Sequence, residues 1–335
     1  MAHRSGIKDV ARRAGVSVGT VSNVFNRPDL VAPTTRQRVE QAAIDLRYLR
    51  NESARQLRVG QGRTIGLVVP DIANPFFTDL ARGIDEVTSA AGALVIMCNS
   101  EHAEKEDRYL TLLAEQQVIG VLVVPVSSST AAIDRLRDLD VPVVLLDYRG
   151  RTHRQCSVAV NDVAGGEMAT SHHLEAGHRR IGFVGAPSDA HQVVDRLAGA
   201  REAMRRAGRD QDDLVLVPTP ALTVEGGTVA ARTVLAMPES ERPTALVCVN
   251  DLLALGVLRV LLQSGTAVPG DIAITGYDDI AYAADAAVPL TSVRQPRGQL
   301  GRRAAELLIE EATNPAHVHS RVVFEPELVV RQSSR

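Results

Sequence analysis

The chain has 335 residues, 45% of them hydrophobic and 23% charged, which is enough for two or three domains with a sizeable core. No apolar run reaches the ~20 residues that cross a bilayer, and the N-terminal MAHRSGIKDV lacks the apolar segment of a signal peptide, so we predict a cytoplasmic protein. Cys98, Cys156 and Cys248 are odd in number and far apart. Their spacing builds neither a disulfide framework nor a zinc site, so we expect buried free thiols. We expect no bound metal and no cofactor.

The charge is distributed unevenly along the chain. Residues 1–60 contain eleven Lys and Arg against five Asp and Glu, a net +6, and the remainder contains 26 against 35, a net −9. A basic N-terminal segment on an acidic body predicts contact with a polyanion such as nucleic acid.

Apolar residues at helical spacing predict three short helices within residues 1–50. The first ends at Gly15, a natural helix stop; Ser17 is the expected N-cap of the second, and Pro33 opens the third. Two short helices joined by a tight turn are typical of the helix-turn-helix motif, whose second helix enters the major groove of DNA.

The second helix carries a glycine and small polar residues on its outer face. Gly19 allows close approach of DNA, Val18 can touch a thymine methyl group, and Asn23 suits adenine. The predicted DNA-contacting residues of this helix are Ser17, Val18, Gly19, Thr20, Ser22, Asn23 and Asn26. A small helical bundle that packs on the body is the alternative interpretation.

The segment NESARQLRVGQG, residues 51–62, is predicted to be a short helix capped by Asn51 and ended near Gly60. Such a helix is too short to persist alone in water. It therefore docks on the body or folds only against a partner, and a frayed linker is the remaining alternative.

From Arg63 onward, apolar strand-like runs alternate with helical stretches. Runs such as TIGLVVP and VPVVLLD form a first set, and RRIGFVG, TALVCV and DIAITGY belong to a second. This rhythm predicts an α/β fold with two doubly wound subdomains. We expect the N-subdomain at residues 63–160 and 292–321 and the C-subdomain at 161–291 and 322–335.

Ligands of open α/β sheets bind beyond the carboxyl ends of the strands. The polar and aromatic residues after those ends, with neighbouring helix and crossover positions, form the predicted effector site: Asn74, Phe76, Phe77, Asp147, Tyr148, Arg196, Asn250, Asp278 and Gln295. Such donors and acceptors suit a neutral polyhydroxylated ligand, for example a sugar. We assign Asp251 and Asp279 to helix caps instead.

The stretches IKDVARRAGVSVGTVSNVFN and VAPTTRQRVEQAAIDLRYLRNESARQLR resemble the DNA-binding headpiece of the lac repressor and galactose repressor family. The resemblance implies a two-lobed body of periplasmic-binding-protein type and hinge helices in the minor groove, where Leu57 wedges between base pairs. Arg55 joins the predicted DNA contacts. The same resemblance points to Asp147, Arg196, Asn250, Asp278 and Gln295 as effector contacts.

The chain departs from this family at several positions. Gly6 stands where the family usually has a threonine, so the cap of the first helix is weaker or falls to Ser5. Val18 and Gly19 occupy the main base-reading positions without polar side chains. Leu222 stands where relatives often stack an aromatic ring on the ligand.

We therefore predict a transcriptional regulator, acting as a repressor, that binds near-palindromic operator DNA as a homodimer and responds to a small effector. The sequence leaves inducer and corepressor modes open. An apolar patch of Phe77, Leu80 and Ile84 is expected to contribute to the dimer contact.

Two other functions fit the sequence less well than a transcriptional regulator does. A solute-binding protein would fit the body but not the headpiece. An enzyme is less well supported, because PDIANPFF stands where a dinucleotide-binding G-x-G-x-x-G would follow the first strand, and His172, His173 and His178 lack H-E-x-x-H spacing.

Overall fold

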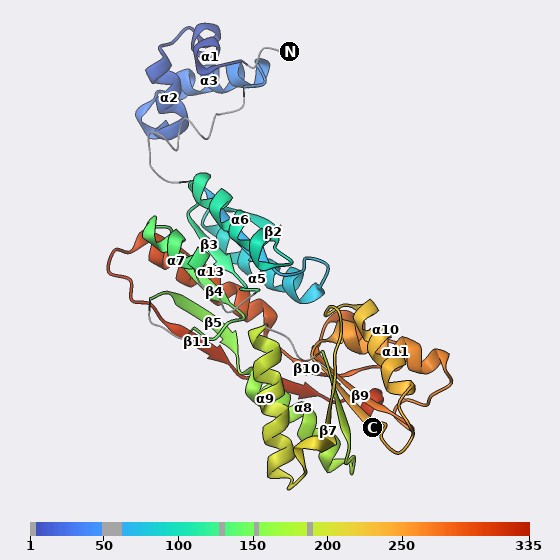
Figure 1. Cartoon of the computed structure of the whole chain (residues 1–335). Helices are drawn as coiled ribbons and strands as arrows, with labels where there is room; N and C mark the ends of the chain where they lie inside the picture. Colours follow the sequence, from blue (N-terminus) through green and yellow to red (C-terminus); the bar gives the residue numbers. More distant parts are fainter. Residues whose placement is uncertain (1–4, 49–61, 127–130, 151–153, 186–189) are drawn as a thin grey trace. The chain divides into compact units, whose positions relative to one another are not determined.

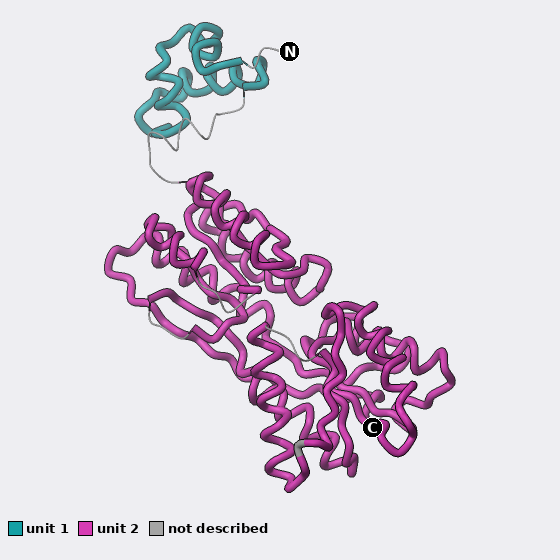
Figure 2. Tube along the Cα trace, in the orientation of Figure 1, with its two compact units in different colours: residues 1–61 teal, residues 62–335 magenta. Residues whose placement is uncertain are grey.

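A computed structural model of the chain describes residues 5–48, 62–126, 131–150, 154–185 and 190–335 (Figure 1). The chain forms two compact units, Met1–Gln61 and Gly62–Arg335 (Figure 2). Within the described ranges, no helix is both long and apolar enough to cross a membrane.

Unit 1 contains three helices in its described part, α1 (Ile7–Ala14), α2 (Val18–Asn26) and α3 (Pro33–Asp45). Gly15 ends α1 in the left-handed region at φ 65°. Ser17 caps α2, because its Oγ accepts a hydrogen bond from the Thr20 amide at 3.0 Å. The three helices share a core of Val10, Ala11, Ala14, Val21, Val24, Val39, Ala42 and Ala43. The predicted helix-turn-helix is confirmed.

The N-terminus of α1 is capped differently from that of α2. Gly6 is the N-cap residue and has no side chain to accept a hydrogen bond, but its own N–H donates to Asp9 Oδ2 at 2.9 Å. The predicted hinge helix, with Asn51, Arg55 and Leu57, lies outside the described residues. Its contacts with DNA stay a prediction.

The described part of unit 2 begins with a six-stranded parallel sheet in the order β11-β5-β4-β3-β1-β2. Its strands are β1 (Thr64–Val69), β2 (Leu94–Asn99), β3 (Gly120–Val123), β4 (Val143–Leu146), β5 (Cys156–Val160) and β11 (Arg321–Phe324). Four helices cover it: α5 (Pro75–Ala90), α6 (Ala103–Glu115), α7 (Ala131–Asp138) and α13 (Arg297–Thr313). α5 and α13 share one apolar cluster with this sheet, and α6 and α7 share another. We call this part the N-lobe.

The second sheet has the order β12-β10-β9-β8-β6-β7, and β12 alone runs antiparallel to its neighbour. Its strands are β6 (Ile181–Val184), β7 (Leu214–Val217), β8 (Ala245–Cys248), β9 (Ala273–Asp278), β10 (Thr291–Arg294) and β12 (Glu327–Val329). The helices of this C-lobe are α8 (Asp162–Glu175), α9 (His191–Arg206), α10 (Val224–Leu235), α11 (Asp251–Gln263) and α12 (Ala281–Ala284). Strands such as β8 are buried along their whole length, as expected for sheets covered on both faces. The predicted fold class is confirmed.

In the described part of unit 2, the chain crosses between the lobes after β5, after β10 and after β11. The predicted bounds are wrong at the last two crossings, because residues 292–294 belong to the C-lobe sheet and 322–324 to the N-lobe sheet. Short apolar runs show that a strand forms but not which sheet edge it joins. Pro326 separates β11 from β12.

The predicted dimer patch on α5 is also wrong. Phe77, Leu80 and Ile84 are buried in the core of their own chain. The stripe that they form is the inner face of an amphipathic helix, which packs here against α13.

Candidate DNA-binding face and effector site

The outer face of α2 contains the predicted DNA-contacting residues. Ser17, Val18, Gly19, Asn23 and Asn26 are exposed, and Val18 retains 37% of its accessible surface. Thr20 and Ser22 are half-buried.

Nothing within unit 1 requires a glycine at position 19. A Cβ built there would lie 3.6 Å from Ser17 Oγ, an ordinary van der Waals contact. Glycine at an exposed helical position costs about 1 kcal/mol relative to alanine. The choice of Gly19 therefore points to a surface that approaches this helix from outside.

In unit 2, the nine predicted effector residues are all buried: Asn74, Phe76, Phe77, Asp147, Tyr148, Arg196, Asn250, Asp278 and Gln295. Hydrogen bonds link the lobes through Asp147 and through Asn74 with Asp278. The hydrogen bonds of Asn250 stay within the C-lobe, and Phe76 and Phe77 belong to an apolar core cluster.

Arg196 on α9 is the most highly connected side chain of the site. Its Nε donates to Asp162 Oδ1 at 2.7 Å, and one terminal nitrogen donates to the Val249 carbonyl at 2.6 Å. The ring of Tyr277 lies 3.6 Å from the guanidinium. Burial lowers the pKa of Arg196, but Asp162 and the other acidic neighbours outweigh this effect and raise it. Arg196 therefore stays charged.

Asp147 follows β4 and accepts hydrogen bonds across the lobes. Gln192 Nε2 on α9 donates to the Asp147 carbonyl at 2.8 Å and to its Oδ2 at 3.0 Å. The other oxygen, Oδ1, is buried and has no hydrogen-bond partner among the described residues. Burial, followed by the charge of Asp162, raises the pKa of Asp147 well above its usual value. Buried polar atoms in folded proteins are rarely left without a partner, which makes this oxygen a candidate ligand contact.

Asp278 ends β9 and joins both lobes. Gln295 Nε2 donates to its Oδ1 at 2.7 Å, and the side chain of Asn74 in the N-lobe also bonds to it. Burial raises the pKa of Asp278 to about 6. Gln295 Oε1 is buried without a hydrogen-bond partner in the described structure.

The side chain of Asn250, which follows β8, forms two hydrogen bonds. Its Oδ1 caps α11 by accepting from the Leu253 amide at 2.9 Å, and its Nδ2 donates to the Leu222 carbonyl at 2.9 Å. Leu222, the predicted substitute for an aromatic wall, therefore lies beside Asn250.

The assignment of Asp251 and Asp279 to helix caps is wrong. The cap of α11 is Asn250. Asp251 instead accepts from Ser292 Oγ at 2.7 Å, and Asp279 forms ion pairs with Arg294 at 2.7 Å and Arg331 at 2.6 Å.

The aromatic residues of the predicted site pack on other rings. Phe76 and Phe77 meet edge to face at 5.1 Å, and Tyr148 meets His191 edge to face at 4.5 Å. Their contact with a ligand stays a prediction.

Three further residues, Asp162, Gln192 and Tyr277, contact Arg196 or Asp147 and were not predicted from the sequence. Gln192 precedes Arg196 by four residues, so the two share one face of α9. This spacing in the sequence could have identified Gln192 as a neighbour of Arg196.

The geometry unites a helix-turn-helix unit and a two-lobed α/β unit with buried polar groups between its lobes, which defines a ligand-responsive DNA-binding regulator. Residues 6–51 match the family model of bacterial regulatory proteins, lacI family. Residues 170–334 match the periplasmic binding protein-like domain.

Relatives and solved structures of this class match nearly the whole chain. The chain is 37% identical to the HTH-type transcriptional repressor PurR of Photobacterium profundum and 35% identical to the ribose operon repressor of Escherichia coli, over 98% of this chain and 98% and 99% of theirs. The chain belongs to the LacI family of regulatory proteins. The predicted class, a DNA-binding regulator with a small-molecule effector, is confirmed.

Two of the solved structures that resemble this chain contain bound molecules. The complex of the transcriptional regulator CelR with cellobiose is 33% identical, with a TM-score of 0.72 over 98% of this chain and 100% of that one. The lac repressor dimer bound to operator and the anti-inducer ONPF is 26% identical, with a TM-score of 0.84 over 99% of both chains.

Proposed function

We propose that this protein is a transcriptional repressor that binds a near-palindromic operator as a homodimer and releases or tightens its hold when a sugar or sugar derivative binds between the body lobes. Residues 1–50 form the DNA-binding headpiece, 51–62 the hinge and 63–335 the effector-binding body. Because its target is chromosomal DNA, it acts in the cytoplasm.

The DNA-binding half of the proposal rests on charge and on α2. The first 60 residues are basic, and Gly19 lies on an exposed face where unit 1 gives no reason for a glycine. The lac repressor dimer, which resembles the whole chain, is bound to operator DNA in its solved structure.

The effector half rests on one observation above the others: buried acceptor atoms without partners lie where the lobes meet. Asp147 Oδ1 and Gln295 Oε1 have no hydrogen bond in the described structure, and both can accept from ligand hydroxyl groups. Arg196 is already paired with Asp162, so its charge is not available to an anion. This combination favours a neutral polyhydroxylated ligand, and a relative binds cellobiose.

The test is a selection followed by release. Genomic fragments that the full-length protein retains are sequenced, and a duplex with the recovered sequence is titrated at increasing salt. Mono- and disaccharides, beginning with D-ribose and cellobiose, are then screened for a change in affinity. Operator affinity should fall by orders of magnitude between about 50 and 200 mM salt as phosphate-bound counterions are released.

Failure of the full-length protein to retard any selected duplex would contradict the DNA-binding half and favour the solute-binding alternative. Retardation that no sugar changes would contradict the effector half alone.

A further inference from the structure

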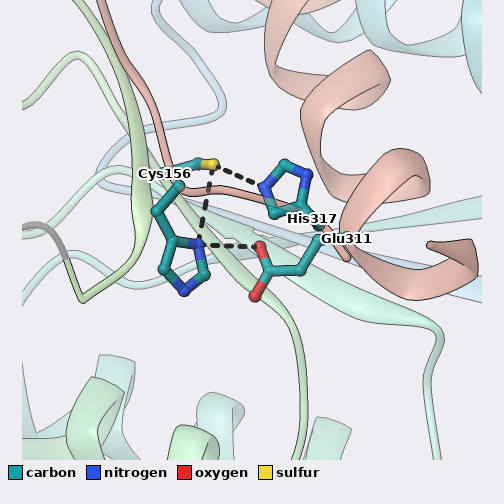
Figure 3. A group of neighbouring side chains, drawn as sticks. Cys156, Glu311 and His317 are labelled. Atoms are coloured by element: carbon teal, nitrogen blue, oxygen red, sulfur yellow. Dashed lines mark hydrogen bonds and ion pairs between the residues drawn. The ribbon is translucent and has the colours of Figure 1, made fainter. Parts of the chain in front are cut away.

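A cluster of metal-ligating side chains lies in the N-lobe, on residues that the DNA-binding and effector proposals do not use. It consists of Cys156, Glu311, His317 and His319, whose ligand atoms all lie within 4.8 Å of one another. Figure 3 shows Cys156, Glu311 and His317 turned toward one another. From this arrangement we propose that the four side chains bind a transition-metal ion, with Zn²⁺ the preferred occupant.

The distances suit a four-coordinate ion. Cys156 Sγ lies 3.1 Å from His317 Nε2 and 3.8 Å from His319 Nδ1, and Glu311 Oε2 lies 3.8 Å from the same His319 nitrogen. In a tetrahedral zinc site, bonds of about 2.0–2.3 Å place the ligand atoms roughly 3.3–3.8 Å apart. Small side-chain movements are therefore enough to admit the ion.

The cluster contains buried polar atoms that the protein itself does not satisfy. Glu311 Oε2 and His317 Nδ1 have no hydrogen-bond partner in the ranges that the structure describes. A metal ion would satisfy Glu311. Coordination through His317 Nε2 would leave its Nδ1 facing Glu310, whose Oε1 lies 3.6 Å away, in the carboxylate–histidine–metal arrangement of many metal sites.

The charges also balance. A thiolate and the carboxylate of Glu311 neutralise Zn²⁺, and the thiol proton passes to solvent on binding. In the metal-free chain, burial raises the pKa of the Cys156 thiol, and the Ser320 amide, which donates to its Sγ at 3.3 Å, opposes this rise only in part. The charge of the ion would therefore have to favour the thiolate. Glu310 on α13 and Arg137 on α7 are the other charged groups that act on this cluster, with opposite signs.

The ligand types select the ion. Thiolate and imidazole favour Zn²⁺ over Mg²⁺ and Ca²⁺, which take oxygen ligands. The other histidine group of unit 2 differs, since His172, His173 and His178 each bond a hydroxyl oxygen of the protein.

The ion would fasten β5 to a stretch of chain that lies more than 150 residues later, at the end of α13 and in the connection that follows it. Cys156 begins β5, Glu311 lies in the last turns of α13, and His317 and His319 stand in the connection to β11. The bound ion would stabilise the folded N-lobe by mass action.

The test uses the full-length protein, stripped of metal with a chelator and dialysed against buffered Zn²⁺. Elemental analysis should find one zinc per chain in the wild type and in the control Cys98→Ser, and loss of this zinc in Cys156→Ser and His319→Ala. The thermal midpoint should rise with zinc in the wild type but not in the two cluster variants.

Cobalt gives a signature of the ligands themselves. Co²⁺ should produce the visible bands of a tetrahedral site and a sulfur-to-cobalt charge-transfer band, and Cys156→Ser should lose the latter. If Cys156→Ser does not fold, His319→Ala decides, because His319 is 31% exposed on its side chain and tolerates truncation. Substoichiometric zinc in the wild type, or full zinc in His319→Ala, would overturn the proposal.

Discussion

The outer face of α2 and the interlobe site both carry polar residues, but the fold constrains them very differently. Val18 and Gly19 are exposed, and Gly19 would tolerate a side chain. Arg196 and Asp278 are buried, and each bonds to several neighbours. The fold of unit 1 therefore does not explain the residues of α2, and they are the better test of the proposed DNA contacts. The residues between the lobes stabilise the fold, whatever part they take in the proposed effector binding. Their two contributions must be separated by experiment.

The largest effect is expected at the buried ion pair of the site. Arg196→Ala leaves Asp162 buried and uncompensated, so the free energy of unfolding should fall by about 3–5 kcal/mol. Urea unfolding at pH 7 measures this. Arg205→Ala on the same helix is the control, because Arg205 pairs with Glu202 at the surface and should leave stability unchanged.

A double variant separates the lost charge pair from lost packing. Arg196→Met with Asp162→Leu removes both buried charges and should regain much of the stability, because well-packed apolar residues replace buried pairs at little cost. Equal stability of Arg196→Ala and Arg205→Ala would contradict the buried pairing.

Asp278 should make stability depend on pH. Burial raises its pKa from 3.8 to about 6, so between about pH 4 and 6 the folded chain holds a proton that the unfolded chain has lost. Stability contributed by this group is present below pH 4, falls as the pH rises, and is lost above pH 6. At about 1.4 kcal/mol per pKa unit, the fall approaches 3 kcal/mol.

Asp278→Asn should remove this part of the slope in unfolding experiments at pH 4, 5, 6 and 7. Burial also raises the pKa values of Asp147 and Asp251, so these two residues should account for the pH dependence that remains in the variant. The exposed Asp285→Asn is the control. If the free energy of unfolding depends on pH equally in Asp278→Asn and in the wild type, Asp278 has the same pKa in the folded and unfolded chains.

The same substitution at two glycines should have opposite consequences. In Gly199→Ala, the new Cβ collides with the Val163 carbonyl oxygen of α8, and the body should lose about 1–3 kcal/mol of stability. In Gly19→Ala, the headpiece should gain up to about 1 kcal/mol while operator affinity falls. Urea unfolding and operator titration of both variants check this.

Gly19→Ala is informative in either direction. Undiminished operator affinity would show that no surface approaches α2 at this position, and a destabilised headpiece would show that the glycine serves the fold.

The smallest effects concern the two caps of the headpiece. Ser17→Ala removes the acceptor for the Thr20 amide and should cost about 1 kcal/mol. Gly6→Ser adds an acceptor to α1 and should gain a few tenths. Hydrogen exchange of residues 7–45 in the full-length chain measures both. Faster exchange in Gly6→Ser would contradict the capping role of this position.

Local patterns predicted the fold class and most of the helices and strands. Apolar periodicity indicated α1, α2 and the strands, and Asp147 and Asp278 do lie at the carboxyl ends of β4 and β9 as expected. Asp162 was missed because its side chain serves a partner on another helix, at a distance of 34 residues. Cys156 and His317 are 161 residues apart, and the pairing of β5 with β11 and the packing of α13 on β5 bring their segments together. Such neighbours depend on topology and leave no local pattern.

The burial of the interlobe residues has a kinetic consequence. In the proposed site, Asp147 Oδ1 is buried. A ligand that binds there requires the lobes to separate first, and separation breaks the hydrogen bonds of Gln192 to Asp147 and of Asn74 to Asp278. The observed rate of effector association should therefore level off at high effector concentration, at the rate of lobe opening, instead of rising in proportion to concentration. The rate of lobe opening would then set the upper limit on how fast the repressor responds to a rise in effector concentration.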